Sequence, residues 1–175
     1  LVLGDVYKRQ IIIVGGMANN IIKYKGHEIG KSIQENNCDQ IIEEIFSLSE
    51  KENCKIIYPE DVTIGKDLNG SPEIRALDNI SKNELILDIG PKTIKAINIL
   101  IEESNTILWN GPAGYFENSN FSKGSMEIAK KIVEKNKNNR IYSVAGGGDT
   151  VALLNNVGAA KYFNFVSTAG GAFLE

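Results

Sequence analysis

The stretch RIYSVAGGGDTVALL, residues 140–154, places three consecutive glycines directly before an acid and a hydroxyl. The β-branched and aromatic residues before the glycines predict a buried strand, and residues 151–154 predict the first turns of a helix. Glycines let the chain turn tightly and let another group approach the backbone. A helix that begins there offers free N–H groups and a positive dipole end to an anion. Asp149 is then suited to hold a cation, and Thr150 offers a hydroxyl to a phosphate. A tight turn with a capping Asp149 is the alternative.

Glycine also follows four other predicted strands of this sequence. Together with the first, these strands end in the motifs VGG, DIGP, NGPAG, AGGG and TAGG. In open α/β sheets, ligands bind at the carboxyl ends of the strands, along one edge. Five glycine-rich strand ends therefore predict one edge where the backbone comes close to a ligand. Five ordinary tight turns are the alternative.

The strands that carry these motifs alternate with amphipathic helices, in which apolar residues recur at helical spacing. Such alternation is typical of a parallel sheet that is covered on both faces. The sequence thus predicts an α/β fold, a doubly wound, Rossmann-like parallel sheet with helices on both faces in a three-layer sandwich. Right-handed connections should join its strands. The expected helices are residues 39–53, 91–104 and 122–138, and the expected strands are residues 11–16, 54–59, 85–91, 105–112, 140–148 and 163–171.

The composition is that of one ordinary soluble domain: of 175 residues, 42% are hydrophobic and 23% charged, and the net charge is −3. The absence of a basic excess argues against a nucleic-acid partner, and no apolar run approaches the length of about 18 residues that a membrane span needs. Cys38 and Cys54 are isolated, so we expect reduced thiols in a cytoplasmic protein without a signal peptide. His27 is the only histidine, and no nucleophile elbow accompanies it, which excludes a Ser-His-Asp hydrolase.

The common nucleotide-binding motifs do not fit by spacing. The Rossmann fingerprint needs G-x-G-x-x-G at a helix start, but GGGDTV has Val151 and GGMANN has Asn20 where the last glycine belongs. A Walker A loop needs four residues between its glycines, and GHEIGKS has three. We therefore expect Lys31 in that segment to be a surface residue. A Rossmann-like oxidoreductase and a catalytically silent nucleotide-binding module remain as alternative functions.

Taken together and in this order, the motifs GGMAN, DIGPKT, WNGPAGYFE, GGGDT and STAGGA resemble the C-terminal, nucleotide-binding domain of phosphoglycerate kinases. The resemblance runs from about Ile11 to Glu175. It implies a cytoplasmic, monomeric glycolytic kinase that transfers a phosphoryl group between 1,3-bisphosphoglycerate and ADP, or between ATP and 3-phosphoglycerate in reverse, with Mg²⁺.

The resemblance assigns roles to the GGGDT motif. Gly147 and Gly148 match glycines on the phosphate side of the nucleotide. Asp149 matches the acid associated with the magnesium-bound phosphates, and a carboxylate is a hard oxygen ligand of the kind that magnesium prefers. Thr150 matches a residue whose hydroxyl and amide meet a nucleotide phosphate.

The WNGPAGYFE motif supplies a second group of nucleotide-binding residues. Asn110 and Pro112 match positions that contact the nucleotide. Glu117 matches the carboxylate that binds the ribose hydroxyls, and a carboxylate readily accepts hydrogen bonds from a diol. Tyr115 stands where the family carries a smaller apolar residue of the nucleotide pocket, and core packing is its alternative role.

The remaining motifs complete the implied site. Gly15 and Gly16, together with Leu87, match the walls of the adenine pocket. Gly170 and Gly171 match the glycine run whose amides face the phosphoryl group in flight, and we assign them as catalytic. Amides aimed at developing charge are much of what phosphoryl transfer needs from a protein.

Several features depart from the family pattern. Val14 and Ala169 each stand where the family usually has the first glycine of three. Residues 1–10 do not resemble the family and are expected to be an atypical, foreign segment, with residues 11–175 forming a partial nucleotide-binding domain. The N-terminal domain that holds phosphoglycerate is expected to be absent. We therefore expect the fragment alone to be catalytically inactive, because positioning of both reactants can supply about 7–11 kcal/mol of a barrier.

Overall fold

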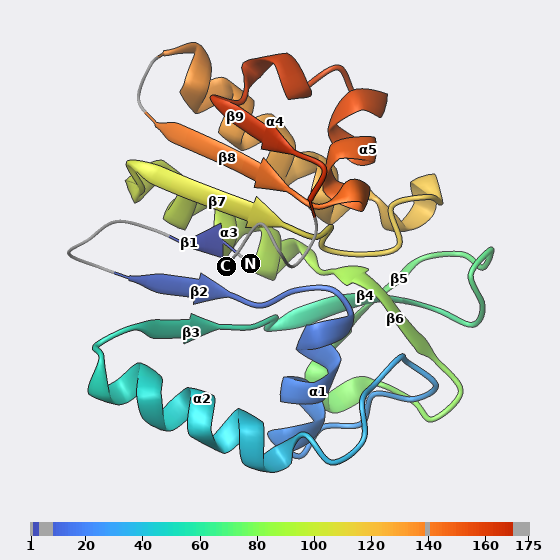
Figure 1. Ribbon diagram of the computed structural model, residues 1–175. Helices are drawn as coiled ribbons and strands as arrows, with labels where there is room; N and C mark the ends of the chain where they lie inside the picture. Colours follow the sequence, from blue (N-terminus) through green and yellow to red (C-terminus); the bar gives the residue numbers. More distant parts are fainter. Residues whose placement is uncertain (1, 4–8, 139–140, 170–175) are drawn as a thin grey trace.

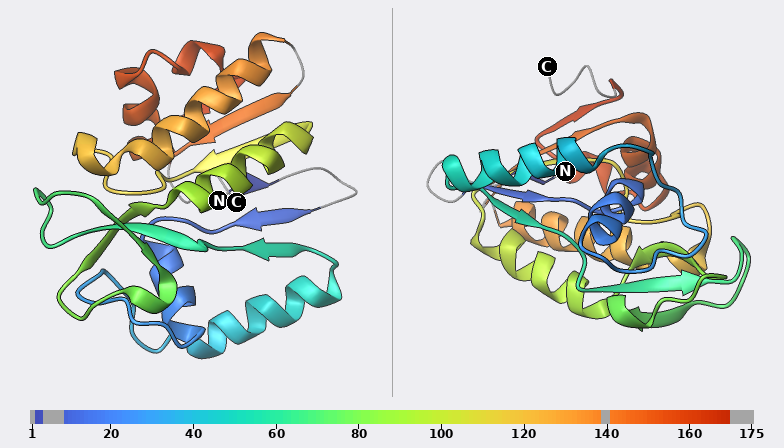
Figure 2. Two further views of the ribbon diagram at one scale, coloured as in Figure 1. Left: turned by 180° about the vertical axis from the view of Figure 1, so that it is seen from behind. Right: turned by 90° about the horizontal axis from the view of Figure 1, so that it is seen from below.

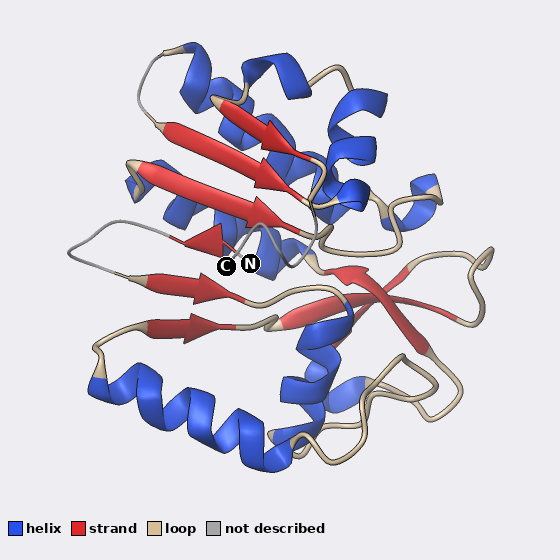
Figure 3. Ribbon diagram, in the orientation of Figure 1, coloured by secondary structure: helices blue, strands red, loops and turns tan. Residues whose placement is uncertain are grey.

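The computed structural model describes residues 2–3, 9–138 and 141–169, which form two β-sheets with flanking helices (Figure 1). The larger sheet has six strands in the order β3-β2-β1-β7-β8-β9, and the smaller has three in the order β5-β4-β6. Figure 3 shows the strands of the two sheets as separate groups. The strands are β1 (Val2–Leu3), β2 (Gln10–Ile12), β3 (Lys55–Ile57), β4 (Asp61–Gly65), β5 (Glu73–Ala76), β6 (Leu85–Ile89), β7 (Thr106–Asn110), β8 (Tyr142–Gly146) and β9 (Phe165–Ser167).

The larger sheet is parallel except at one short strand. β2 runs parallel to β3, and β8 runs parallel to both β7 and β9. β1 has two residues and is antiparallel to both of its neighbours, β2 and β7. A parallel crossover needs a dozen or more residues, and the connection from β1 to β2 is too short for one. The parallel α/β sheet predicted from the sequence is confirmed, with β1 as the exception.

Helices cover both faces of the larger sheet, as predicted. α1 (Gly16–Tyr24) and α2 (Asp39–Lys51) lie on one face, and α3 (Pro91–Glu103), α4 (Lys123–Lys137) and α5 (Gly148–Asn156) lie on the other. The view from below in Figure 2 shows α2 and α3 on opposite sides of the strands. Among the described residues, no helix is both long enough and apolar enough to cross a membrane.

The alternation of side chains along each strand produces these layers. Ile12 of β2, with Ile107 and Trp109 of β7, points into the core that α3, α4 and α5 cover. Ile13 packs on the opposite face against Ala18 of α1 and other apolar residues of α1 and α2. Successive residues of a strand face opposite ways, so two separate apolar layers form from one apolar run.

The smaller sheet was not predicted, and it changes the place of the LILDIGP strand. β6, which carries this motif, pairs antiparallel with β4 and lies outside the larger sheet. Among the described residues between β3 and α3, the only helix is a three-residue 3₁₀ helix, Leu77–Asn79. Without a crossover helix, neighbouring strands in this region pair antiparallel.

α3 is held at both ends by charged side chains from other elements. Asp61 of β4 accepts hydrogen bonds from the backbone N–H groups of Lys92 (3.0 Å) and Thr93 (2.8 Å) in the first turn. Lys135 of α4 is buried, and its Nζ donates to the carbonyl oxygen of Ile101 (2.9 Å) and to two further carbonyls at the helix end. A carboxylate at the N-terminus and an ammonium at the C-terminus satisfy unpaired backbone groups and match the helix dipole.

Asp88 of β6 joins the smaller sheet to α4. Its carboxyl is buried, and Oδ2 accepts a hydrogen bond from the backbone N–H of Gly124 in the first turn of α4 at 2.7 Å. Oδ1 accepts the N–H of Ile89 at 2.9 Å. Burial raises the pKa of Asp88 to about 7, although the two hydrogen bonds and the nearby charge of Lys123 oppose the rise. The carboxyl is therefore half-protonated near neutral pH.

We expect Asp61→Ala to lower the free energy of unfolding by about 2–4 kcal/mol, because it leaves buried donors at the start of α3 without an acceptor. Urea denaturation monitored by circular dichroism measures this. Asp78→Ala is the control, because the Asp78 side chain is 84% exposed and pairs with His27 at 2.8 Å. An exposed pair contributes at most about 1 kcal/mol. Equal losses in the two variants would contradict the capping role of Asp61.

The raised pKa of Asp88 predicts a pH-dependent stability. Because the pKa rises from 3.8 to about 7 on folding, the folded chain keeps a proton that the unfolded chain releases between these values. The free energy of unfolding therefore falls as pH rises through this window, by up to about 4 kcal/mol at about 1.4 kcal/mol per pH unit.

Asp88→Asn should remove this slope, since Asn stays neutral and keeps an acceptor for Gly124. Urea denaturation of both proteins at pH 5, 6, 7 and 8 measures it. The variant should gain stability relative to the wild type as pH rises. A stability difference that stays constant over this range would show that Asp88 does not titrate there.

Candidate nucleotide-binding site

One cavity of about 480 Å³ lies where the carboxyl ends of β2, β6 and β7 meet the start of α1. Both sheets contribute to it, so the cavity lies along the seam between them. Its lining is mostly apolar and includes the carboxylates Asp88, Glu117 and Asp149. The lining residues that the sequence analysis named are Gly15, Gly16, Leu87, Asn110, Pro112, Tyr115, Glu117 and Asp149.

Two helices begin at this cavity, each after a glycine with a left-handed backbone. Gly15 precedes α1 with φ +64°, and Gly147 precedes α5 with φ +90°. A Cβ at Gly15 would lie 3.0 Å from the carbonyl oxygen of Pro112, and one at Gly147 would lie 2.9 Å from Oδ1 of Asn110. Glycine is therefore required at both places, by conformation and by close approach. No side-chain cap closes either helix start, so these N-termini suit an anion.

Residues 110–117, which follow β7, form one wall of the cavity and are fixed from three sides. The N–H of Gly111 donates to Oγ1 of Thr150 on α5 at 2.7 Å. The N–H of Ala113 donates to Oγ of Ser125 on α4 at 2.8 Å. The N–H of Tyr115 donates to the carbonyl of β6 residue Leu87 at 2.7 Å. The wall is thus set by β6, α4 and α5 together.

The hydroxyl of Thr150, which the motif assigned to a nucleotide phosphate, is bonded within the protein. Its side chain is fully buried, and its hydroxyl accepts the Gly111 N–H, so it ties the start of α5 to the segment after β7. Gly147 precedes α5, and Gly148 and Thr150 lie in its first turn; none of the three lines the cavity, whereas Asp149 does.

Asp149 and Glu117 are the exposed acids of the cavity. Asp149 lies in the first turn of α5, where it makes no capping hydrogen bond. Within the described part of the chain, neither carboxylate has a hydrogen-bond or ion-pair partner. The capping role that the sequence left open for Asp149 is not seen, and both carboxylates are available to a ligand.

The electrostatics of the cavity are unusual for an anion site. Asp88, Glu117 and Asp149 line it, and no lysine, arginine or histidine does so among the described residues. A phosphate here would meet helix N-termini and carboxylates. The described ranges contain no group of three or more acidic, His or Cys side chains that could hold a metal ion by themselves.

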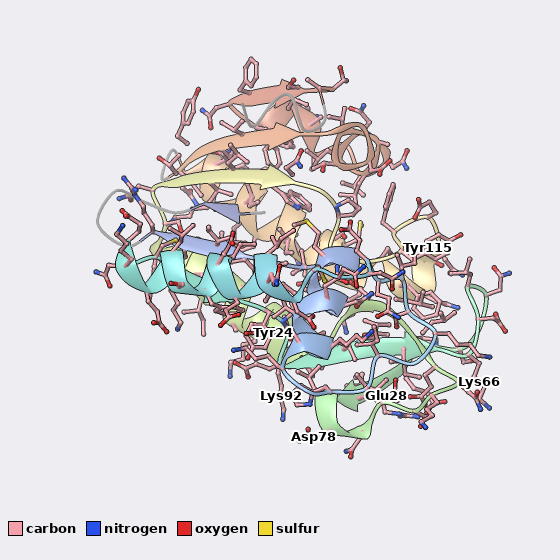
Figure 4. All side chains as sticks on the ribbon, turned by 60° about the horizontal axis from the view of Figure 1, so that its bottom comes forward. Tyr24, Glu28, Lys66, Asp78, Lys92 and Tyr115 are labelled. Carbon is pink, nitrogen blue, oxygen red and sulfur yellow. The ribbon has the colours of Figure 1, made fainter. Side chains whose placement is uncertain are left out.

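Tyr115 is half-buried and lines the cavity. Figure 4 shows it on the loop that follows β7, away from Lys92 at the start of α3. Trp109, by contrast, is fully buried in the core and donates from Nε1 to the Gly111 carbonyl at 2.8 Å. Gly170 and Gly171 lie outside the described residues.

The sequence analysis missed one side of the cavity. Met17 and Asn19 of α1 line it, as do Ser32 and Ile33 of the segment that follows. The rule that ligands bind at strand ends cannot find residues 32–33, because they follow a helix. Their segment contains the GHEIGKS stretch, in which Lys31 is exposed as predicted.

Comparisons with known proteins agree on one family. The family model described as phosphoglycerate kinase matches residues 2–175. Phosphoglycerate kinase of Zymomonas mobilis is 45% identical over 167 residues, which are 94% of this chain and 42% of that protein. The Rhodopseudomonas palustris phosphoglycerate kinase is 42% identical over the same coverage.

A solved structure shows the same likeness. The phosphoglycerate kinase of Coxiella burnetii superposes with a TM-score of 0.87 at 35% identity, covering 94% of this chain and 42% of that one. The chain therefore spans about two fifths of the length of its relatives. With a family match along nearly its whole length, this chain belongs to the phosphoglycerate kinase family.

Proposed function

We propose that residues 11–175 are the C-terminal, nucleotide-binding part of a glycolytic phosphoglycerate kinase. The enzyme would transfer a phosphoryl group between 1,3-bisphosphoglycerate and ADP, with Mg²⁺, as a cytoplasmic monomer. Because the relatives are more than twice as long, the phosphoglycerate site would belong to a separate domain. We infer that the 175-residue chain alone transfers little phosphate, because it would position only one of the two reactants.

The observation that carries this proposal is the convergence of separate segments on one cavity. Gly15 after β2, Leu87 of β6, Pro112 after β7 and Asp149 of α5 are far apart in the sequence, and all of them line it. Each was assigned to the nucleotide from its motif alone. A cavity with an apolar body and a few polar groups at one side is typical of a small-molecule site.

The lining supports one orientation of the nucleotide. The apolar part, with Gly16 and Leu87, would receive the base. Glu117 would accept hydrogen bonds from the ribose hydroxyls. The start of α5, with Gly147 and Gly148, would face the phosphates, where its free N–H groups favour negative charge. Asn110 at the end of β7 lines the cavity and lies close to Gly147, because a Cβ at Gly147 would be 2.9 Å from its Oδ1.

Asp149 fits a magnesium ion that is shared with the nucleotide. Magnesium in phosphate sites is commonly held by one or two carboxylates, with phosphate oxygens and waters completing its octahedron. An exposed, unpaired carboxylate in the first turn of α5 supplies one such ligand. When bound, the metal neutralises charge on the phosphates. We assign Gly170 and Gly171 as amide donors to the transferring group on the resemblance alone.

We expect Glu117→Gln to weaken binding of adenosine and of ADP by a similar factor, about three- to tenfold, because it removes a charged acceptor for the ribose. Isothermal titration calorimetry with both ligands measures this. Glu134→Gln on the exposed side of α4 is the control and should bind both ligands normally. If ADP binding fell while adenosine binding did not, Glu117 would act on the phosphates and the assignment would be wrong.

We expect Asp149→Asn to weaken Mg-ADP binding about tenfold and ADP binding in EDTA by less than about twofold, because Asn lacks the charge that a hard cation needs. Titration calorimetry of both proteins, with magnesium and with EDTA, gives the comparison.

Asp39→Asn is the matched control, since Asp39 also lies in the first turn of an exposed helix, α2, outside the cavity. It should leave both affinities unchanged. Equal losses with and without magnesium in Asp149→Asn would reject the metal role, and a wild-type chain that bound no nucleotide would reject the proposed function.

A further inference from the structure

Residues 28–35, which we name the strap, connect two walls of the cavity. On one side the strap is bonded to the region of β6. Gly30 forms a bridge with Leu85, and Ser32 Oγ accepts the N–H of Ile86 at 2.8 Å. Figure 4 shows Glu28 on the pale blue segment that leaves α1 and passes beside the green part of the chain. The strap thus begins against the smaller sheet.

On its other side the strap is bonded to side chains of α1. Three consecutive strap residues each receive one contact from the same face of the helix. The contacts are Asn19 Nδ2 to the Ile33 carbonyl (2.9 Å), Lys23 Nζ to Gln34 Oε1 (2.6 Å), and the Glu35 N–H to Asn20 Oδ1 (2.9 Å). The spacing of these residues on α1 follows from the helical period, which places residues three and four apart on one face.

Asn19 differs from the other two α1 residues that contact the strap, because it is more buried and because it lines the cavity. It is 2% exposed and lines the cavity, whereas Lys23 is exposed and Asn20 is not part of the lining. Its partner Ile33 also lines the cavity, and this apolar residue is 80% exposed. The Asn19 amide therefore holds the one apolar residue of the strap that lines the cavity.

The buried Asn19 amide is satisfied on one side only, through Nδ2. Its Oδ1 is buried and accepts no hydrogen bond from any described residue. Burying a polar atom without a partner is unfavourable, so a buried amide of this kind calls for an explanation other than the stability of the core. The hydrogen bond from its Nδ2 to the cavity wall supplies one.

We propose that Asn19 is a positioning residue for the nucleobase, which it serves by fixing Ile33 as a wall of the apolar part of the cavity. The inference rests on the proposed nucleotide function of this site and deepens it. Asn19 acts through Ile33 and not by touching the phosphates. Its loss should therefore affect the base and leave untouched the extra affinity that the phosphates provide.

Asn19→Leu tests this, because Leu has a similar size and cannot hold the Ile33 carbonyl. We expect adenosine and ADP to bind about tenfold more weakly, each by the same factor. The free energy of unfolding should be unchanged or higher, because an apolar side chain replaces an unsatisfied buried amide. Titration calorimetry and urea denaturation of the 175-residue chain measure both. A purely structural role predicts the opposite pattern, with lower stability and intact binding.

Two further variants sharpen the test. Asn20→Leu is the matched control, since it removes the neighbouring contact to the strap outside the cavity, and it should change adenosine affinity by less than about twofold. Ile33→Ala removes the wall itself. In the Ile33→Ala background, Asn19→Leu should have almost no further effect on adenosine binding, because the two residues act as one unit.

Three results would overturn the inference while the proposed function stands. These are unchanged nucleotide binding in Asn19→Leu, a loss for ADP without a loss for adenosine, and full additivity of Asn19→Leu with Ile33→Ala. A wild-type chain that bound neither adenosine nor ADP would instead contradict the proposed function, and the inference with it.

Discussion

The buried carboxyl of Asp88 is the contact on which the arrangement of the cavity depends. It accepts the N–H of Gly124 at the start of α4, and it packs against Gly114 so closely that a Cβ there would lie 2.6 Å from Oδ1. Through these contacts it fixes β6 of the smaller sheet against the wall that follows β7. Since the cavity lies along this seam, Asp88 and the two glycines set the spacing of its two sides together with the hydrogen bond from the Tyr115 N–H to the Leu87 carbonyl.

The same carboxyl makes the stability of the seam depend on pH, because its pKa lies at about 7. A buried acid is costly to ionise, and here two backbone hydrogen bonds and Lys123 only partly offset that cost. α3 shows the contrasting solution, in which Asp61 and Lys135 are each satisfied by several backbone groups at a helix end. Buried charged side chains therefore have two roles in this fold. Asp61 and Lys135 hydrogen-bond the two ends of α3, and Asp88 connects β6 to the start of α4.

The charge pattern of the cavity accounts for how an acidic lining can suit an anionic ligand. The described lining has three acids and no basic side chain, so within it the groups that would attract the phosphates of the proposed nucleotide are the backbone amides at the starts of α1 and α5. Both helix starts are left uncapped by side chains, after Gly15 and Gly147. Asp149 at the second residue of α5 then places a carboxylate beside free amides, an arrangement suited to an anion that arrives with a cation.

The sequence by itself determined the strands of the larger sheet other than β1 and the flanking helices other than α1. Local periodicity and glycine placement specify these features, so α2, α3 and α4 begin and end within about two residues of their predicted bounds. Only the tertiary structure decided the smaller antiparallel sheet, the place of Ile33 in the cavity and the burial of Thr150. Each of these depends on pairing between distant segments, such as Ser32 with Ile86 or Thr150 with Gly111, and no local pattern records which distant partner a hydroxyl or an amide will meet.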